Sequence, residues 1–154
     1  MRPAALAAVL LSLCGCGAHV TPIIGPPPQP PVQAFVIPAE ATFILTVSEA
    51  VGNPDEDLPS FVKVFVDGRE AGRTATEPKS KERRWGEAVA PGNHLFRFEV
   101  WVQPTVGEPA PVRADWQPPE RFIRVEPGQR TLVSLKFVDG GRRHALQTQR
   151  EPLQ

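Results

Sequence analysis

The sequence predicts an all-β domain, a small antiparallel β-sandwich, over residues 40–139. Roughly seven short runs rich in β-branched and aromatic residues alternate there with clusters of Gly, Pro, Asn and Asp, a spacing typical of strands and turns. The clearest runs alternate apolar and charged residues with a period of two, as expected for a sheet with one buried face. No helical repeat of 3.6 residues accompanies them, so a helical domain is not expected.

The chain begins with a segment that is typical of a secretory signal peptide. One positive charge, Arg2, precedes an uncharged run of mostly Ala, Leu and Val that extends to Leu13. A membrane-spanning helix needs about 20 apolar residues, and the run before Gly15 is shorter. We therefore expect export and removal of residues 1–15, not a retained transmembrane helix.

Both cysteines of the chain lie at the end of this segment, within Leu13-Cys14-Gly15-Cys16. A Leu three residues before a Cys, with a small residue directly before that Cys, resembles the signal of bacterial lipoproteins. The resemblance implies diacylation of Cys16 and cleavage after Gly15. Two acyl chains anchor a protein stably in a membrane, whereas a single chain binds only marginally. Gly17 stands where this family has an Asp for inner-membrane retention, so the resemblance implies the outer membrane.

The alternative is an ordinary signal peptide and a soluble secreted domain. Removal of residues 1–15 would leave Cys16 as the only cysteine, so no internal disulfide can form. Lipidation would remove an otherwise exposed and unpaired thiol. We therefore favour the lipid anchor.

Residues 16–39 are predicted to be the lipidated Cys followed by a Pro-rich linker. Pro26-Pro27-Pro28 and Pro30-Pro31 exclude a helix or a central strand and favour extended polyproline II. Such a segment is a semi-rigid spacer between the anchor and the domain. The alternative is a docking ligand for a Pro-recognising groove.

The first half of the domain predicts three strands. Residues 42–47 (TFILTV) and 61–66 (FVKVFV) have the composition of strands. Asp67-Gly68 directly follows the second run and is the strongest short hairpin signal. Residues 69–74 are therefore expected to return as the partner strand, with Gly72 at a bulge or bend.

The second half contains the clearest strand, residues 94–102. Phe96 and Phe98 fall on its inward face, and Arg97 and Glu99 fall on its outward face. Pro91-Gly92 before it is expected to form a type II turn after residues 85–90. Residues 121–125 and 131–138 are expected to pair across the turn at 126–129. The segments without strand character are expected to be loops at 77–84 and 104–119 and a flexible tail at 140–154.

These turns and strand ends resemble those of the PEGA family. The resemblance rests on Val64-Phe65-Val66-Asp67-Gly68, Gly72-Arg73-Thr74, Ala90-Pro91-Gly92-Asn93-His94 and the segment from Ile123 to Gly128. It implies an immunoglobulin-like or transthyretin-like module of bacterial envelope proteins, without enzymatic activity. The long segments at 77–84 and 104–119 and the lack of Tyr depart from the family pattern.

Composition gives no support to catalysis, metal binding or nucleic-acid binding. Basic and acidic residues are equal in number, 17 each, so no general attraction to nucleic acid is expected. His19, His94 and His144 lie far apart in the chain, and no nucleophile or carboxylate pair stands out. Asn53 and Asp57 have the spacing of a calcium loop with Asp55, but the required Gly and Glu are absent, which favours a solvated turn. We expect no enzyme, no cofactor and no metal.

Four residues are candidates for ligand binding: Trp85 and Arg84 in the basic segment 79–85, with Trp101 and Trp116. If the three Trp side chains share one concave face, the protein is expected to be a carbohydrate- or peptidoglycan-binding receptor or an enzyme accessory module. If they are dispersed, a non-catalytic interaction module with a protein or glycan partner is expected. We favour the interaction module, anchored in the bacterial cell envelope.

Overall fold

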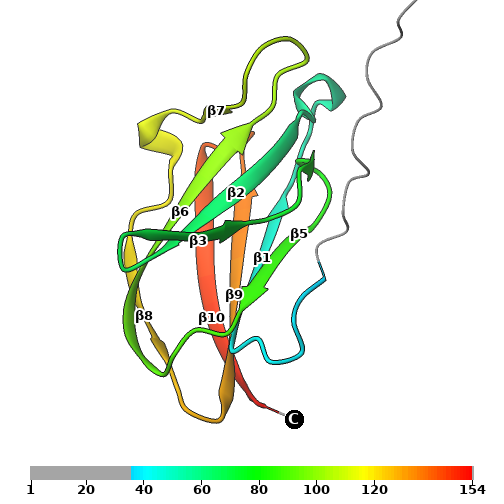
Figure 1. Ribbon diagram of the computed structural model, residues 1–154. Helices are drawn as coiled ribbons and strands as arrows, with labels where there is room; N and C mark the ends of the chain where they lie inside the picture. The colour runs from blue at the N-terminus through cyan, green and yellow to red at the C-terminus, as the bar shows by residue number, and fades with distance from the viewer. Residues whose placement is uncertain (1–35, 154) are drawn as a thin grey trace, which may run out of the picture. The chain divides into compact units, whose positions relative to one another are not determined.

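The computed structural model describes residues 36–153, which form an all-β domain of two sheets (Figure 1). Sheet A has four strands in the order β10-β9-β1-β5. Sheet B has six strands, β3-β2-β6-β7 with β4 beside β2 and β8 beside β6. The strands are β1 (Phe43–Glu49), β2 (Pro59–Val66), β3 (Arg69–Arg73), β4 (Glu77–Pro78), β5 (Arg83–Glu87), β6 (Gly92–Val102), β7 (Ala110–Pro111), β8 (Arg121–Val125), β9 (Gln129–Val138) and β10 (Arg143–Pro152).

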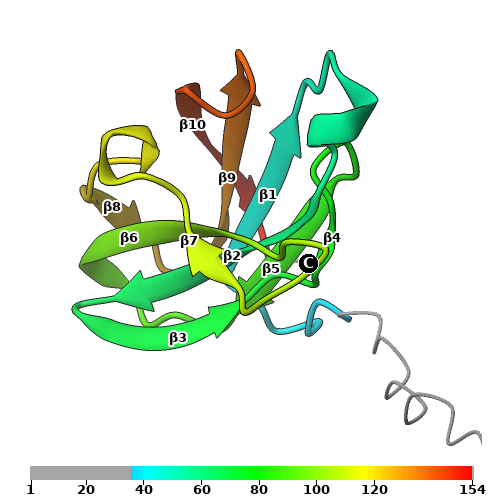
Figure 2. The ribbon, with the colours of Figure 1, turned by 90° about the horizontal axis from the view of Figure 1, so that it is seen from above.

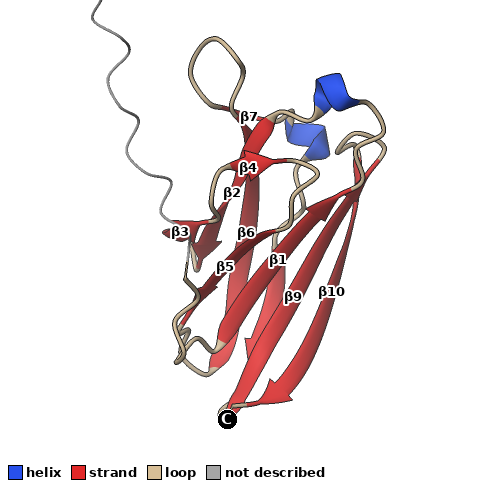
Figure 3. Ribbon diagram, turned by 90° about the vertical axis from the view of Figure 1, so that its right-hand side faces the viewer, coloured by secondary structure: helices blue, strands red, loops and turns tan. Residues whose placement is uncertain are grey.

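The described residues contain two short 3-10 helices, η1 (Pro54–Glu56) and η2 (Ala114–Trp116). Both lie at the same end of the domain as β7 (Figure 3). In residues 36–153 no helix is long and apolar enough to cross a membrane. The predicted all-β class is therefore confirmed for this part of the chain.

The core lies between the two sheets and follows from period-two alternation. Every second residue of β1, from Phe43 to Glu49, is buried, and the central residues of β6 and β9 alternate in the same way. The Phe43 ring stacks on that of Phe96 with 4.2 Å between centroids, which joins sheet A to sheet B. Each fully buried Phe, Leu or Val contributes about 1.5–3 kcal/mol. The inward faces predicted for 94–102 and 131–138 are confirmed.

The hairpin predicted at Asp67-Gly68 is confirmed. Asp67 has a φ of +50° and Gly68 a φ of +80°, the pair of positive values that a type I′ turn needs. The predicted bulge is also present, because Val64 faces Gly72 while Phe65 faces Glu70, which leaves one extra residue on β3.

The predicted strand partners are partly wrong. The sandwich is not wholly antiparallel, because β1 pairs in parallel with β9. The strands predicted as a closing pair lie in different sheets: β8 pairs with β6, and β9 pairs with β1 and β10. Residues 88–91 likewise connect sheet A to sheet B and do not close a hairpin. Turn residues show where a strand ends. They do not show which strand it pairs with, because that depends on which sheet has an unpaired edge strand nearby.

The flexible tail predicted at 140–154 is wrong, because β10 pairs with the whole of β9 from Arg143 opposite Val138 to Pro152 opposite Gln129. This strand is polar because it forms the edge of sheet A; Leu146 packs against the core, and the His144 ring lies 6.0 Å from that of Phe137. The loop predicted at 77–84 is also partly wrong, since it contains β4 and the start of β5. Arg83 at that start is fully buried, which a charged residue seldom is.

Trp85 of sheet A lies against Gly72 of sheet B in the interior. A Cβ at Gly72 would be 2.6 Å from the indole Nε1, closer than any real contact. We predict that Gly72→Ala lowers the free energy of unfolding by about 1–3 kcal/mol, because the indole must shift in a packed core. Gly52→Ala is the control, since a Cβ there meets nothing within 4 Å, and should stay within about 0.5 kcal/mol. Urea unfolding of both variants measures the difference; equal effects would contradict this packing.

His94 at the start of β6 fixes the hairpin turn. Its Nδ1 donates to Asp67 Oδ2 at 2.7 Å and its Nε2 donates to the Ala90 carbonyl at 2.8 Å, so both ring nitrogens carry hydrogens. The hydrogen bond to Asp67 is the main cause that raises the pKa of His94, and the same bond is the main cause that lowers the pKa of Asp67. The site therefore favours the imidazolium.

We predict that His94 stabilises the fold fully below about pH 6.5, the pKa of an unfolded His, and less as pH rises through its raised pKa. The difference in unfolding free energy between wild type and His94→Gln should shrink over that range. His144 gives a control of opposite sign, because burial lowers its pKa; wild type should lose stability relative to His144→Gln as pH falls below about 6.5. If the stability difference from wild type changes with pH in the same direction for both variants, the opposite pKa shifts of His94 and His144 are refuted.

Candidate functional site

The four predicted ligand-binding residues do not share one surface. Trp85 is 2% exposed and packs in the core beside Phe43, with 6.0 Å between ring centroids. Arg84 points out of the other face of β5 and pairs with Glu82 at 2.7 Å. Trp101 lies on the outer face of sheet B, and Trp116 lies in η2. The prediction is wrong for Trp85, whose ring is not available to a ligand.

The outer face of sheet B carries a ladder of aromatic and charged side chains, which we call the sheet B face. Register places three cross-strand pairs from β2 and β6 side by side. These pairs are Phe61 with Trp101, Lys63 with Glu99, and Phe65 with Arg97. Because inward residues alternate with these along β6 and the second half of β2, the ladder lies on the outer face of the sheet. Phe61 is only 3% exposed there, so Phe65 and Trp101 supply the accessible aromatic surface.

Each aromatic ring of the sheet B face lies beside a cation. The Lys63 ammonium is 4.7 Å from the centroid of a Trp101 ring, and the Arg97 guanidinium is 3.9 Å from that of Phe65. Arg73 of β3 lies 4.7 Å from the centroid of Phe61. Such contacts are worth about 0.5–1 kcal/mol at exposed sites. They order long side chains on the open face of the sheet.

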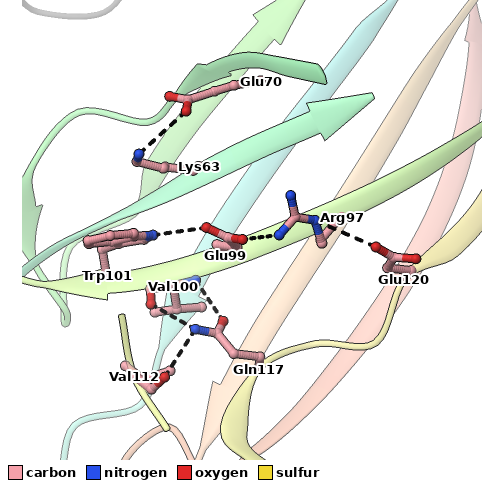
Figure 4. Close-up of polar contacts among 9 residues, drawn as sticks. All are labelled: Lys63, Glu70, Arg97, Glu99, Val100, Trp101, Val112, Gln117 and Glu120. Carbon is pink, nitrogen blue, oxygen red and sulfur yellow. Dashed lines mark hydrogen bonds and ion pairs between the residues drawn. The ribbon is translucent and has the colours of Figure 1, made fainter. Parts of the chain in front are cut away.

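Carboxylates balance these cations (Figure 4). Lys63 pairs with Glu70 at 3.4 Å, and Arg97 pairs with both Glu99 and Glu120, the latter at 3.5 Å. Glu99 also accepts a hydrogen bond from the Trp101 indole at 3.3 Å. The face therefore carries both signs of charge and attracts neither a polyanion nor a polycation in general.

A hollow of about 540 Å³ adjoins the sheet B face, between β6 and the segment 111–120. The Gln117 side chain holds this segment, since its Oε1 accepts from the Val100 amide at 2.8 Å. Its Nε2 donates to the carbonyls of Val100 and Val112 at 3.1 and 3.2 Å (Figure 4). The amide thus replaces a neighbouring strand beside β6, and the wall of the hollow is fixed.

Sequence reasoning missed most of the sheet B face, although a signal for it was present. The outward positions of the two clearest strands hold Phe61, Phe65 and Arg97, where solvated strands more often hold small polar residues. Gln117 had no signal, because its partners are backbone groups that only the fold brings close.

The acidic segment 53–57 forms a turn around η1. Asn53 accepts a hydrogen bond from the Asp55 amide at 3.1 Å, and Asp57 accepts from the Ser80 amide and hydroxyl at 2.8 and 2.6 Å. These two bonds are the main causes that lower the pKa of Asp57. Within residues 36–153 no group of three His, Cys, Asp or Glu residues is placed to hold a metal ion. Cys16, the predicted lipidation site, and His19 lie outside the described residues.

Comparison with known protein families, curated proteins and solved structures finds no match to this chain. The resemblances to lipoprotein signals and to the PEGA family therefore stay predictions.

Proposed function

We propose that this chain is a lipid-anchored protein of the bacterial cell envelope that presents a non-catalytic β-sandwich as a protein-binding module. Cys16 would hold the anchor, in the outer membrane, and the Pro-rich linker would space the domain from the bilayer. The domain would be of the immunoglobulin-like or transthyretin-like kind. The observation that carries the binding role is the ordered ladder of aromatic rings and ion pairs on the sheet B face.

The composition of the sheet B face favours a protein partner. Protein interfaces are enriched in aromatic residues and Arg, and their energetic centres are often Trp and Arg. Trp101 and Arg97 lie on one strand, each next to a carboxylate, so apolar and charged contacts alternate over a short distance. A protein partner must present both apolar and charged groups in the matching positions, which makes such a surface specific.

A second candidate is a carbohydrate- or peptidoglycan-binding receptor or an enzyme accessory module. The hollow beside Trp101, bordered by Glu99 and Glu120, favours it, since carboxylates and an indole are typical partners of sugars. Against it, the Lys63 ammonium lies over the Trp101 ring and would have to move before a sugar could stack there. The protein partner remains the better proposal.

The lipid anchor is tested by metabolic labelling with palmitate in a bacterial host. We predict that wild type incorporates label and partitions into the detergent phase, because acyl chains on Cys16 bury in the bilayer. Cys16→Ser should incorporate no label, and Cys14→Ser is the control that should retain both label and partition into detergent. Equal partition of wild type and Cys16→Ser into the aqueous phase would refute the anchor.

The binding face is tested by photo-crosslinking in intact envelopes. A benzophenone amino acid replaces either Glu70, at the edge of the sheet B face, or Gln147, on the exposed strand β10 of sheet A. We predict one discrete protein adduct from position 70 and none from 147. Trp101→Ala should reduce that adduct about 10-fold or more, as expected for a central Trp of an interface.

Arg84→Ala is the control for the crosslinking experiment, because Arg84 lies on the outer face of sheet A. It should leave the adduct from position 70 unchanged. Equal adducts from both positions would refute the sheet B face as the binding surface. Sedimentation with purified peptidoglycan, lost in Trp101→Ala, would favour the glycan-binding candidate.

A further inference from the structure

A pocket of about 370 Å³ opens at the end of the sandwich where β7 and η2 lie, the end that faces the viewer in Figure 2. Its walls are mostly apolar and come from both sheets and the segment 104–116. They include Val100, Val102, Pro111, Val112, Trp116 and Phe137. The volume lies within the range of 300–1,000 Å³ that is typical of small-molecule sites.

A carboxylate lines this apolar pocket. Glu49 occupies the last inward position of β1, after Phe43, Leu45 and Val47, where the pattern would place another apolar residue. Its side chain is 3% exposed, and Lys79, which also lines the pocket, is 15% exposed. The core is therefore polar at this end of the sandwich, where Glu49 is buried and Lys79 is largely buried.

Each Glu49 oxygen lies beside a cation, but neither cation is within hydrogen-bond distance of it. Oε2 lies 4.0 Å from Nη2 of the buried Arg83. Arg83 donates through Nη1 to Ser60 Oγ, and its Nη2 and Nε have no hydrogen-bond partner. Oε1 is buried and has no hydrogen-bond partner; Lys79 Nζ is 3.8 Å away, beyond hydrogen-bond range. Native proteins rarely leave such an acceptor unpaired. Burial is also the main cause that raises the pKa of Glu49, against the effect of Lys79 and Arg83.

The turn between β9 and β10 approaches this carboxylate with a glycine, Gly141. Asp139, Gly140 and Gly141 all have positive φ, from +54° to +85°. A Cβ at Gly141 would lie 3.3 Å from Glu49 Oε1, so glycine leaves the space beside the oxygen clear.

We propose that this pocket binds a small uncharged amphipathic molecule, with its apolar body between the walls and a hydroxyl that donates to Glu49 Oε1. An ammonium group is disfavoured because Lys79 and Arg83 already lie within about 4 Å of the carboxylate and would repel it. A carboxylate group is disfavoured because it would meet Glu49. The pocket lies at the end of the sandwich, so this proposal does not depend on the sheet B face.

Three probes with one aromatic body test the proposal: 2-phenylethanol, 2-phenylethylamine and phenylacetate. Each is titrated calorimetrically into the full chain carrying Cys16→Ser, which removes the lipid attachment. We expect 2-phenylethanol to bind, and the amine and the acid to bind about 10-fold more weakly or not at all, the difference of a lost hydrogen bond to a charged group. No binding of 2-phenylethanol would overturn the proposal, and equal or tighter binding of the amine or the acid would overturn the hydroxyl assignment.

Two variants locate the probe. Ala110→Trp, at the exposed mouth of the pocket, should abolish binding of 2-phenylethanol, whereas Ala145→Trp, on the exposed edge strand β10, should leave it unchanged. Glu49→Gln should weaken binding about 10-fold, because an amide oxygen replaces the carboxylate. If Glu49→Gln fails to fold around Arg83, Ala110→Trp decides alone. Binding that survives Ala110→Trp would overturn the proposal.

Discussion

The packing of Phe43 on Phe96 between the two sheets is the contact on which the rest of the domain depends. Because each strand alternates its side chains, fixing these two rings inside fixes the direction of every other residue on β1 and β6. Arg97, Glu99 and Trp101 then face outward in one row without any further device. The sheet B face is thus a consequence of core register.

The sequence predicted the strands well and their partners poorly. In residues 94–102 and 131–138, Phe, Val and Leu alternate with polar residues. This local pattern predicts which side chains are buried without knowledge of the neighbouring strands. The parallel pair of β1 with β9 and the docking of β10 on β9 are choices among free edges, which no local pattern records. Strand β10 shows this most clearly, since an edge strand needs few apolar residues and therefore has the composition of a flexible tail.

The candidate sites were predictable where they follow the alternation of side chains between the two faces of a strand. Trp101 was predicted only as an aromatic candidate, and its position on the outer face follows from the alternation of β6. Trp85 was misjudged because the segment 77–84 before it is highly charged, and only the approach of Gly72 from the other sheet shows that the indole has room inside. Glu49 was missed for the converse reason: it breaks an apolar pattern at the last position of a strand, where a polar residue usually marks the strand end.

Strand β6 contributes to both proposed sites with opposite faces. Val100 and Val102 line the end pocket, while Glu99 and Trp101 lie on the sheet B face, so residues next to each other in sequence belong to different surfaces. Gln117 joins the two, since it bonds to the Val100 backbone and borders the hollow beside Trp101. The segment 104–119 therefore contributes walls to both cavities. A domain reduced to its two sheets would keep the aromatic ladder and lose the concave surfaces beside it.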